Sequence, residues 1–247
     1  MVFAVTVEEV LYFLFNRSFK LYPFSAITTS IGIMLMVYSS YLWLYLILTL
    51  FALLQKYLIK IQNHHLFNPS NFAILIMLLF FNQFGAISNG TLGHNSYLLG
   101  LVLALGGWIL IRVDRWIVSV SFFIFYTLFE LLFIDSNTIL VDDFFERFLM
   151  VSFIVFVFFM LTDPATTPKN PIFQTIFAIL VSLFSAIFDR FYGVRVEHTF
   201  LALSLVSPLW ILFEKRAFKE IILVELILIV AIFFILSQPI IYIGSPD

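Results

Sequence analysis

Long apolar segments follow one another along almost the whole chain, separated by polar stretches of about a dozen residues or fewer. Of the 247 residues, 62% are apolar and 11% are charged, whereas a soluble domain is about 45–50% apolar and about 25% charged. Polar groups this scarce cannot cover the surface of a soluble protein, but a lipid bilayer requires no such cover. The sequence therefore predicts an all-α, polytopic integral membrane protein that folds as a helix bundle.

We expect about nine hydrophobic segments, several of them short for a full crossing of a bilayer core of about 30 Å. They lie near 24–38, 41–59, 70–84, 96–111, 116–134, 147–162, 172–188, 198–213 and 219–243. Only the stretch from Tyr38 to Tyr41 separates the first two segments. A single helix through both would be about 55 Å long at 1.5 Å per residue, so the chain must turn or break between them.

The N-terminal segment, residues 1–22, does not resemble a signal peptide, because two glutamates precede its first basic residue and no small-residue cleavage site follows. A helix through it would place Leu11, Phe15 and Phe19 on one side. Apolar residues on one side of a short helix are typical of helices that lie in the membrane surface. We therefore predict an amphipathic, surface-lying lead-in to the first span.

Basic residues are distributed unevenly between alternate loops, and membrane proteins keep most of theirs on the cytoplasmic side. With a cytoplasmic N-terminus, the nine segments place ten Lys and Arg residues inside and three outside. The inner ones are Arg17, Lys20, Lys56, Lys60, Arg112, Arg115, Lys169, Lys215, Arg216 and Lys219, and the outer ones are Arg147, Arg190 and Arg195. The acidic residues Asp135, Asp142 and Asp143 also fall outside. We predict a multi-pass protein with a cytoplasmic N-terminus and an external C-terminus.

Several classes of function are excluded by what the chain lacks. The net charge is −2 and no basic stripe occurs, so the sequence does not indicate nucleic-acid binding. The absence of cysteine excludes Cys-ligated zinc, iron–sulfur clusters and thiol nucleophiles. No catalytic triad, phosphate loop or metal-ligand spacing is present. We therefore predict no catalytic and no metal-binding residues.

Two polar segments pair Asn or Asp with proline. Asn68–Pro69 is typical of a helix start, in which Asn caps the helix and Pro takes its first position. Asp163–Pro164 has the same pattern and is followed by Thr166 and Lys169. Both elements fall on the predicted cytoplasmic side, where each would point a helix N-terminus with free N–H groups into the bundle, a device that binds anionic or electron-rich groups. Caps with tight turns and no ligand are the alternative.

Other polar residues in apolar surroundings have simpler interpretations. Hydroxyls gather in residues 23–30, and those such as Thr28 can bond to carbonyls of their own helix. Glu130 and Glu225 lie in or near apolar runs, where a snorkelling or helix-paired carboxylate is expected. Asp189–Arg190 is interpreted as an ion pair at the membrane interface.

Five short motifs carry a resemblance to a known family. They are SAITT at 25–29, HLFNPSNF at 65–72, NGTLG at 89–93, FMLTDPATTP at 159–168 and LSLVSP at 203–208. Together, and in this order, they resemble motifs of the NqrB/RnfD family, the flavin-carrying membrane subunits of ion-translocating NADH:quinone and ferredoxin:NAD oxidoreductases. The chain also resembles short members of the family that are described as UnbU-like.

The resemblance implies a helical core of two similar halves with broken half-helices, covering residues 23–213. An additional C-terminal transmembrane helix would follow at 219–243. It also implies a plasma-membrane protein of the bacterial inner membrane that transports electrons through flavin. Its partners would be the lipid bilayer and other membrane or periplasmic redox subunits, and it would be an electron-transfer subunit rather than a stand-alone enzyme.

The cofactor expected from the resemblance is a non-covalent flavin, either riboflavin or FMN. Familiar members attach one FMN covalently to the threonine of an SGAT motif, but this chain contains no SGAT, and Thr91 in Asn-Gly-Thr-Leu does not match it. We therefore predict that no FMN is covalently attached. The residues expected to contact the flavin are Asn68, Pro69, Asp163, Pro164, Thr166, Thr28 and Lys169.

Two other functions stay open on the sequence. Broken helices at related positions are also a transporter device, so the same fold could pass a small polar solute as a transporter or channel. A non-redox scaffold subunit that kept the fold without the cofactor is the other alternative. A bound yellow chromophore would distinguish the flavin reading from both.

Overall fold

The computed structural model describes residues 1–18, 22–61, 64–88, 90, 96–133, 146–215 and 218–238, and these are mainly helical. The helices are α1 (Val2–Asn16), α2 (Phe24–Met36), α3 (Leu42–Leu58), α4 (Pro69–Phe80), α5 (Ser96–Val113), α6 (Trp116–Phe133), α8 (Val151–Val155), the π-helical turn η1 (Phe156–Met160), α9 (Pro171–Tyr192), α10 (Glu197–Lys215) and α11 (Phe218–Ser237). Four two-residue strands are β1 (Val37–Tyr38), β2 (Lys60–Ile61), β3 (His64–His65) and β4 (Ala86–Ile87). Each predicted hydrophobic segment contains a helix, so the predicted all-α fold is confirmed.

The predicted break between the first two segments is present. α2 ends at Met36, and the chain then forms β1, which pairs antiparallel with β4 beyond the end of α4. The Ser39 hydroxyl donates to the carbonyl of Phe84 at 2.7 Å, and the Tyr45 hydroxyl donates to the carbonyl of Val37 at 3.0 Å. Backbone that leaves a helix inside a membrane protein needs such partners, and these contacts supply them.

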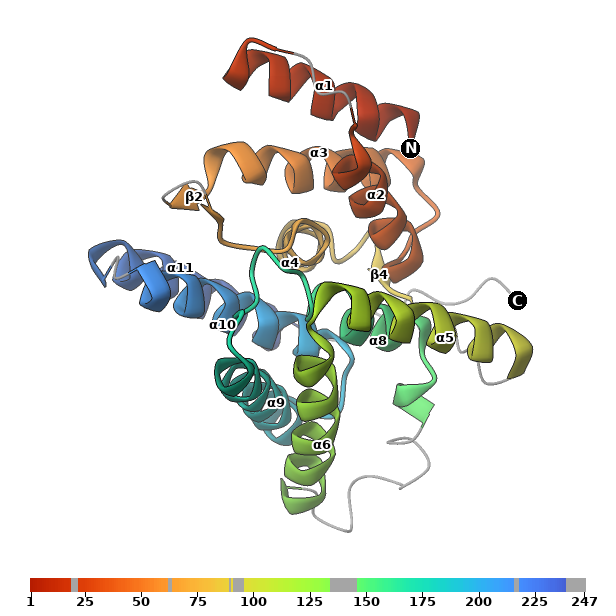
Figure 1. Ribbon diagram of the computed structural model, residues 1–247, viewed down its shortest axis with the longest axis vertical. Coiled ribbons are helices and arrows are strands. Elements are labelled where there is room, and N and C mark those ends of the chain that lie inside the picture. The colour runs from red at the N-terminus through yellow and green to blue at the C-terminus, as the bar shows by residue number, and fades with distance from the viewer. Residues whose placement is uncertain are drawn as a thin grey trace.

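Helix α10 lies in the middle of the bundle, and its side chains from His198 to Ser207 are buried. It packs against α9, α4 and α11. α4 appears end-on in Figure 1, between α3 and α10, and it contacts both. α6 packs along α9, and the Phe122 ring of α6 contacts those of Phe153 in α8 and Phe156 in η1. The buried core is thus a set of helices around α10, with α4 linking it to the α2–α3 pair.

The outer surface of the bundle is apolar in the manner expected of lipid contact. On α11 alone, Ile222, Leu226, Val230 and Phe233 are each at least 60% exposed. Two helices, Trp116–Phe133 and Pro171–Tyr192, are long and apolar enough to cross a membrane, and shorter apolar helices accompany them in the part of the chain that the structure describes. A soluble protein rarely exposes apolar patches this large, so the surface agrees with a membrane environment.

The N-terminal segment forms a helix, α1, that packs against α2 and α3 at one edge of the molecule (Figure 1). Leu11 is buried against them, and Phe15 stacks on Tyr57 with ring centroids 5.1 Å apart. Glu8 is also buried, and its carboxylate lies 3.5 Å from the Lys56 ammonium. Phe19 lies outside the described residues. The position of α1 in a membrane surface stays a prediction.

Candidate functional site

Asn68 caps α4 as the sequence predicts. Its side-chain oxygen accepts from the backbone N–H groups of Ser70 at 3.0 Å and Asn71 at 3.2 Å. Pro69 occupies the first helical position and has no N–H, while the N–H of Phe72 donates to the carbonyl of Asn68 at 2.9 Å. The first turn of α4 is therefore fully bonded within the protein. The expectation that its N–H groups are free for a ligand is wrong.

Asp163 begins a turn, and the expected helix start at Asp163–Pro164 is wrong. The Asp163 carboxylate accepts from the N–H of Ala165 at 3.0 Å, and its carbonyl accepts from Thr166 and Thr167. Pro168 then prevents the turn from continuing as a helix, because it lacks an N–H and disfavours helical geometry in the residue before it.

Helix α9 begins further along the chain, at a third Asx–Pro pair. Asn170 caps it by accepting from the N–H of Ile172 at 2.9 Å, and Pro171 takes the first position. A capping Asn or Asp followed by proline does begin this helix, but at Asn170–Pro171 and not at the predicted Asp163–Pro164.

The structure brings the two predicted elements together. The side-chain amide of Asn68 donates to the second carboxylate oxygen of Asp163 at 2.9 Å, across 95 positions of sequence. Asn68 thus uses its oxygen on α4 and its nitrogen on Asp163, and Asp163 uses its two oxygens on Ala165 and Asn68. We call this contact the Asn68–Asp163 clamp. It fixes the start of α4 against the turn that precedes α9.

A π-helical turn leads directly into the clamp. The N–H of Leu161 donates to the carbonyl of Phe156 at 2.9 Å, a spacing of five residues. The hydroxyl of Thr167 reaches back to the carbonyl of Leu161 at 2.9 Å and closes the turn. π-helical turns are rare and occur frequently at functional sites, so the element supports the position of the predicted site without identifying a ligand.

The other predicted site residues have unequal surroundings. Thr166 is 1% exposed, and its hydroxyl has no hydrogen-bond partner among the residues that the structure describes. Lys169 and Pro164 are exposed. Thr28 is also exposed, and its hydroxyl bonds to the carbonyls of Phe24 and Ser25 in its own helix, at 3.1 Å each. Thr166 is therefore the predicted site residue whose buried hydroxyl is still available as a donor. Thr28 instead bonds to carbonyls of its own helix.

Several buried polar residues around the clamp were not predicted. The Ser70 hydroxyl donates to the carbonyl of Thr29 at 3.3 Å and ties α4 to α2. The Asn71 amide donates to the Ser204 hydroxyl of α10 at 2.9 Å, which leaves the Asn71 oxygen without a partner in the described part of the chain. Gln55 of α3 donates to the carbonyl of Phe67 at 3.2 Å. Asn71 lies inside the motif around Asn68–Pro69, which is the signal that could have identified it.

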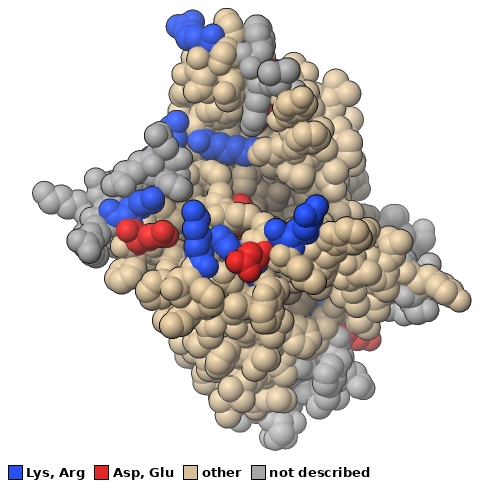
Figure 2. Space-filling view, in the orientation of Figure 1, with Lys and Arg blue, Asp and Glu red and all other residues tan. Residues whose placement is uncertain are grey.

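The clamp lies at a basic end of the bundle. The β2–β3 hairpin joins the end of α3, which carries Lys56 in its last turn, to the start of α4. Gln174 of α9 donates to the carbonyls of Asp114 at 3.3 Å and Lys169 at 3.1 Å, so the turn between α5 and α6 reaches the start of α9. Figure 2 shows Lys and Arg side chains gathered around the middle of the visible face, with a few acidic ones among them.

A second polar cluster lies at the other end of α9, and the predicted Asp189–Arg190 ion pair does not form. One oxygen of Asp189 accepts from Arg147 at 2.8 Å and from the Tyr126 hydroxyl at 3.1 Å. The other lies 2.6 Å from Nδ1 of His198 and accepts from the N–H of Arg195 at 2.9 Å. Arg190 instead donates to the carbonyl of Phe133 at 2.9 Å.

Glu130 of α6 also belongs to this cluster, because its buried carboxyl group lies near enough to that of Asp189 to interact with it electrostatically. We call Tyr126, Glu130, Arg147, Asp189 and His198 the Asp189 network. Glu225, by contrast, is buried on α11, and neither of its oxygens has a partner among the described residues.

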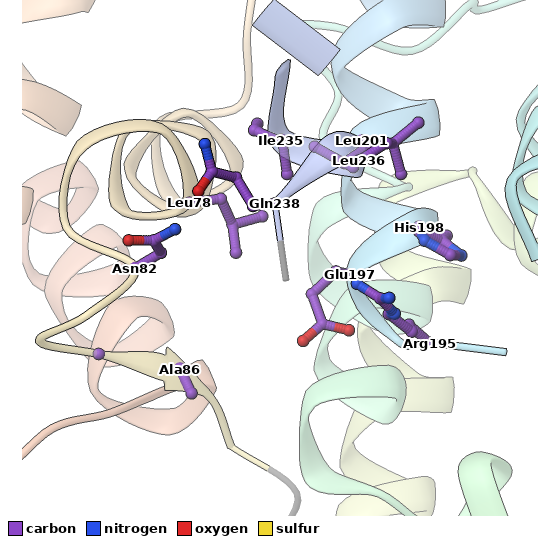
Figure 3. A pocket seen from close by; sticks show the side chains of 11 residues that line it. Leu78, Asn82, Ala86, Arg195, Glu197, His198, Leu201, Ile235, Leu236 and Gln238 are labelled. Carbon is purple, nitrogen blue, oxygen red and sulfur yellow. The ribbon is translucent and has the colours of Figure 1, made fainter. Parts of the chain in front are cut away.

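Two cavities of the described structure lie away from the clamp, since no clamp residue lines either of them. A polar cavity of about 90 Å³ lies between the end of α4 and the ends of α10 and α11, and it is lined by Asn82, Arg195, Glu197, His198 and Gln238 among others. In Figure 3, Glu197 and Asn82 face one another across it, and His198 lies on its α10 side. An apolar groove of about 320 Å³ lies between α5, α6 and η1.

The clamp and the Asp189 network are far apart along the bundle axis. Asn170 caps one end of α9, and Asp189 lies in the last turn of the other. They are 19 positions apart along the helix, about 28 Å at 1.5 Å per residue, which is close to the thickness of a bilayer core of about 30 Å. By the predicted topology, the clamp is cytoplasmic and the network is external.

Comparison with known proteins places the chain in a family. Residues 76–215, more than half of the sequence, match the profile of the NQR2, RnfD, RnfE family. The match includes Asp163 and the Asp189 network, begins after Asn68–Pro69, and ends before α11. Among curated proteins, none matches the chain. The chain belongs to the NQR2, RnfD, RnfE family, whose members are membrane subunits of electron-transport complexes.

Proposed function

We propose that this protein carries electrons through a flavin, riboflavin or FMN, bound non-covalently beside the Asn68–Asp163 clamp. The observation that carries the proposal is the 2.9 Å contact between Asn68 and Asp163, which joins the two family-like motifs at the basic end of the bundle. Its electron partners would be other membrane or periplasmic redox subunits in the bacterial inner membrane. When bound, the flavin would accept and release electrons, and the protein would hold and orient it.

The motifs that contain the clamp residues also hold unused polar groups of the kinds that the edge of a flavin ring binds. That edge presents several acceptors and one N–H donor. The hydroxyl of Thr166 is a buried donor without a partner in the described residues, and the Asn71 oxygen is a buried acceptor in the same condition. Buried polar groups are nearly always bonded, so these two atoms favour a ligand that offers both kinds of group.

Charge contributes less to this site than hydrogen bonding. One capped helix end faces the clamp instead of two, and a helix N-terminus favours negative charge by roughly 0.3–1 kcal/mol, or about 2 when partly buried. The carboxylate of Asp163 opposes that effect, and the exposed Lys169 is screened by water. The site therefore favours a neutral or mildly electron-rich ring held by directional hydrogen bonds, with the clamp residues positioning α4 and the turn.

A Thr166→Val substitution tests the proposal, because flavin binding weakens only if the hydroxyl bonds to flavin. If the hydroxyl bonds to flavin, its loss weakens binding by about tenfold, the equivalent of one hydrogen bond of roughly 1.4 kcal/mol. If nothing binds there, removing an unpartnered buried hydroxyl leaves stability unchanged or raises it. The measurement is flavin per protein after mild detergent purification, with helicity by circular dichroism.

Ser185→Ala is the matched control, because Ser185 is also buried with an unpartnered hydroxyl but lies on α9 away from the clamp. It should keep its flavin. The double variant Asn68→Ala, Asp163→Ala should lose flavin while it keeps its helicity. A wild-type protein that carries no flavin after reconstitution with FMN and with riboflavin would refute the proposal. Solute flux in liposomes would then separate a transporter from a scaffold.

A further inference from the structure

The Asp189 network buries more titratable groups than a structural ion pair requires. Glu130 and Arg147 are each 2% exposed, Asp189 is 4% and His198 is 1%. The side chains come from α6, from the short helical stretch before α8, from α9 and from α10. Arg147 and Asp189 alone would form a balanced pair at 2.8 Å. Glu130 and His198 are two further groups that can gain or lose a proton.

Charge balance limits the states that this network can occupy. The Arg147 cation and the Asp189 anion cancel, so burial without net charge requires Glu130 and His198 to be both neutral or both charged. These two states of the network, each without net charge, differ only in whether Glu130 or His198 holds one proton. Glu130 and His198 both approach the Asp189 carboxylate, so that carboxylate bridges the two proton positions.

His198 connects the network to water. Its Nδ1 lies 2.6 Å from Asp189, and the short distance indicates that Nδ1–H donates to the carboxylate. Its Nε2 has no partner among the described residues, although the ring is buried. His198 also lines the polar cavity of about 90 Å³ (Figure 3). That cavity has room for about three waters at roughly 30 Å³ each, and a water there is the available partner for Nε2.

We infer that the Asp189 network is a proton relay, which passes a proton between the water-filled cavity and Glu130 by way of His198 and Asp189. In the inward direction, a proton from cavity water forms an N–H bond at Nε2 of His198, so that His198 and Glu130 are both charged, and the N–H bond at Nδ1 then breaks. The released proton forms an O–H bond on Asp189 and then moves to the Glu130 carboxylate. Reversal returns the proton to the cavity, and no oxidant or reductant is needed.

Other polar groups contact Asp189 or line the cavity beside it. Arg147 and the Tyr126 hydroxyl bond to one oxygen of Asp189, while His198 bonds to the other. Glu197 and Arg195 line the cavity together with His198 (Figure 3). The relay gives a membrane electron-transfer subunit a place to take up or release a proton at the end of the bundle opposite the clamp.

Hydrogen–deuterium exchange of the buried carboxyl proton tests this relay in the full-length protein in detergent. The infrared carbonyl band of a protonated carboxyl group should disappear in Glu130→Gln, which assigns it. In the wild-type protein the band should shift soon after transfer to heavy water. His198→Asn keeps a donor to Asp189 but cannot titrate, so we expect exchange at least tenfold slower.

His65→Asn, the same substitution at the opposite end of the bundle, should leave the exchange rate unchanged. If His198→Asn does not keep its helicity, His198→Gln also removes the titratable nitrogens and replaces it in the comparison. A band that persists in Glu130→Gln would overturn the inference. Equal exchange rates in the wild-type protein and the His198 variants would overturn it as well.

Discussion

Two adjacent glycines on α5 provide a direct test of how that helix packs. A Cβ atom added at Gly106 would lie 2.6 Å from Cδ1 and 2.8 Å from Cγ of Phe158 in η1. A Cβ atom added at Gly107 would meet nothing within 4 Å. The same substitution at two neighbouring positions therefore probes contact with η1 in one case and open surroundings in the other.

The expected difference follows from the two distances. Ordinary contacts begin near 3.4 Å, so in Gly106→Ala the ring must retreat by nearly 1 Å. Rotation about the Cβ–Cγ bond of Phe158 does not help, because Cγ lies on that axis. Overpacking of this kind costs typically 1–3 kcal/mol, whereas alanine in place of glycine stabilises a helix interior by roughly 0.5–1 kcal/mol.

Gly106→Ala should therefore lower the free energy of unfolding, and Gly107→Ala should raise it by about 0.5–1 kcal/mol. Both variants gain the same helix propensity, so the difference between their free energies of unfolding measures the clash with Phe158, about 1–3 kcal/mol. Unfolding in mixed micelles with increasing SDS, followed by circular dichroism, gives both values. Phe158→Leu should reduce the cost at Gly106 and leave Gly107 unaffected. Equal stabilities of the two alanine variants would show that α5 does not pack on η1.

Three further results are expected. Arg147→Ala removes the cation that pairs with the buried Asp189 carboxylate and should cost about 3–5 kcal/mol of stability. Arg190→Ala, at an exposed position, should cost less than about 1 kcal/mol. Unfolding in detergent measures both losses, and similar values would contradict the burial of the network. A reporter fused after Arg115 should be cytoplasmic and one within residues 136–142 external, and the same side for both would show that the segment count is wrong. Denaturing electrophoresis should show no flavin fluorescence at the mass of the protein, and a fluorescent band would demonstrate a covalent acceptor.

The helices could be predicted because their signal is local. In a bilayer, a run of apolar residues must satisfy its backbone internally, and a helix does this within one segment. The break after α2 was predictable for the same reason, since the length of the combined run exceeds the membrane. The internal similarity of two halves and the orientation in the membrane stay predictions. Asn89, Thr91 and the acidic stretch from Asp135 to Asp143 lie outside the described residues.

The candidate site was predictable in part. Asn68 is a cap by local chemistry, because its side chain reaches the N–H groups two and three residues later. The chain contains three Asx–Pro pairs, and local pattern does not distinguish a helix start from a turn at Asp163. That distinction depends on the following Pro168 and on the amide of Asn68, which arrives from another helix. The N–H groups in the first turn of α4 are not free for a ligand, because Asn68 accepts from them.

The sequence alone determined that this chain is a helical membrane protein, where its helices lie, and which residues begin α4. These properties depend on apolar content and on side chains within a few positions of one another. The tertiary structure decided which distant groups meet: Asn68 with Asp163, Asn71 with Ser204, and Asp189 with Arg147 and His198. Buried polar groups must find partners because the surrounding medium offers none, and which partner each one finds is fixed by how the helices pack.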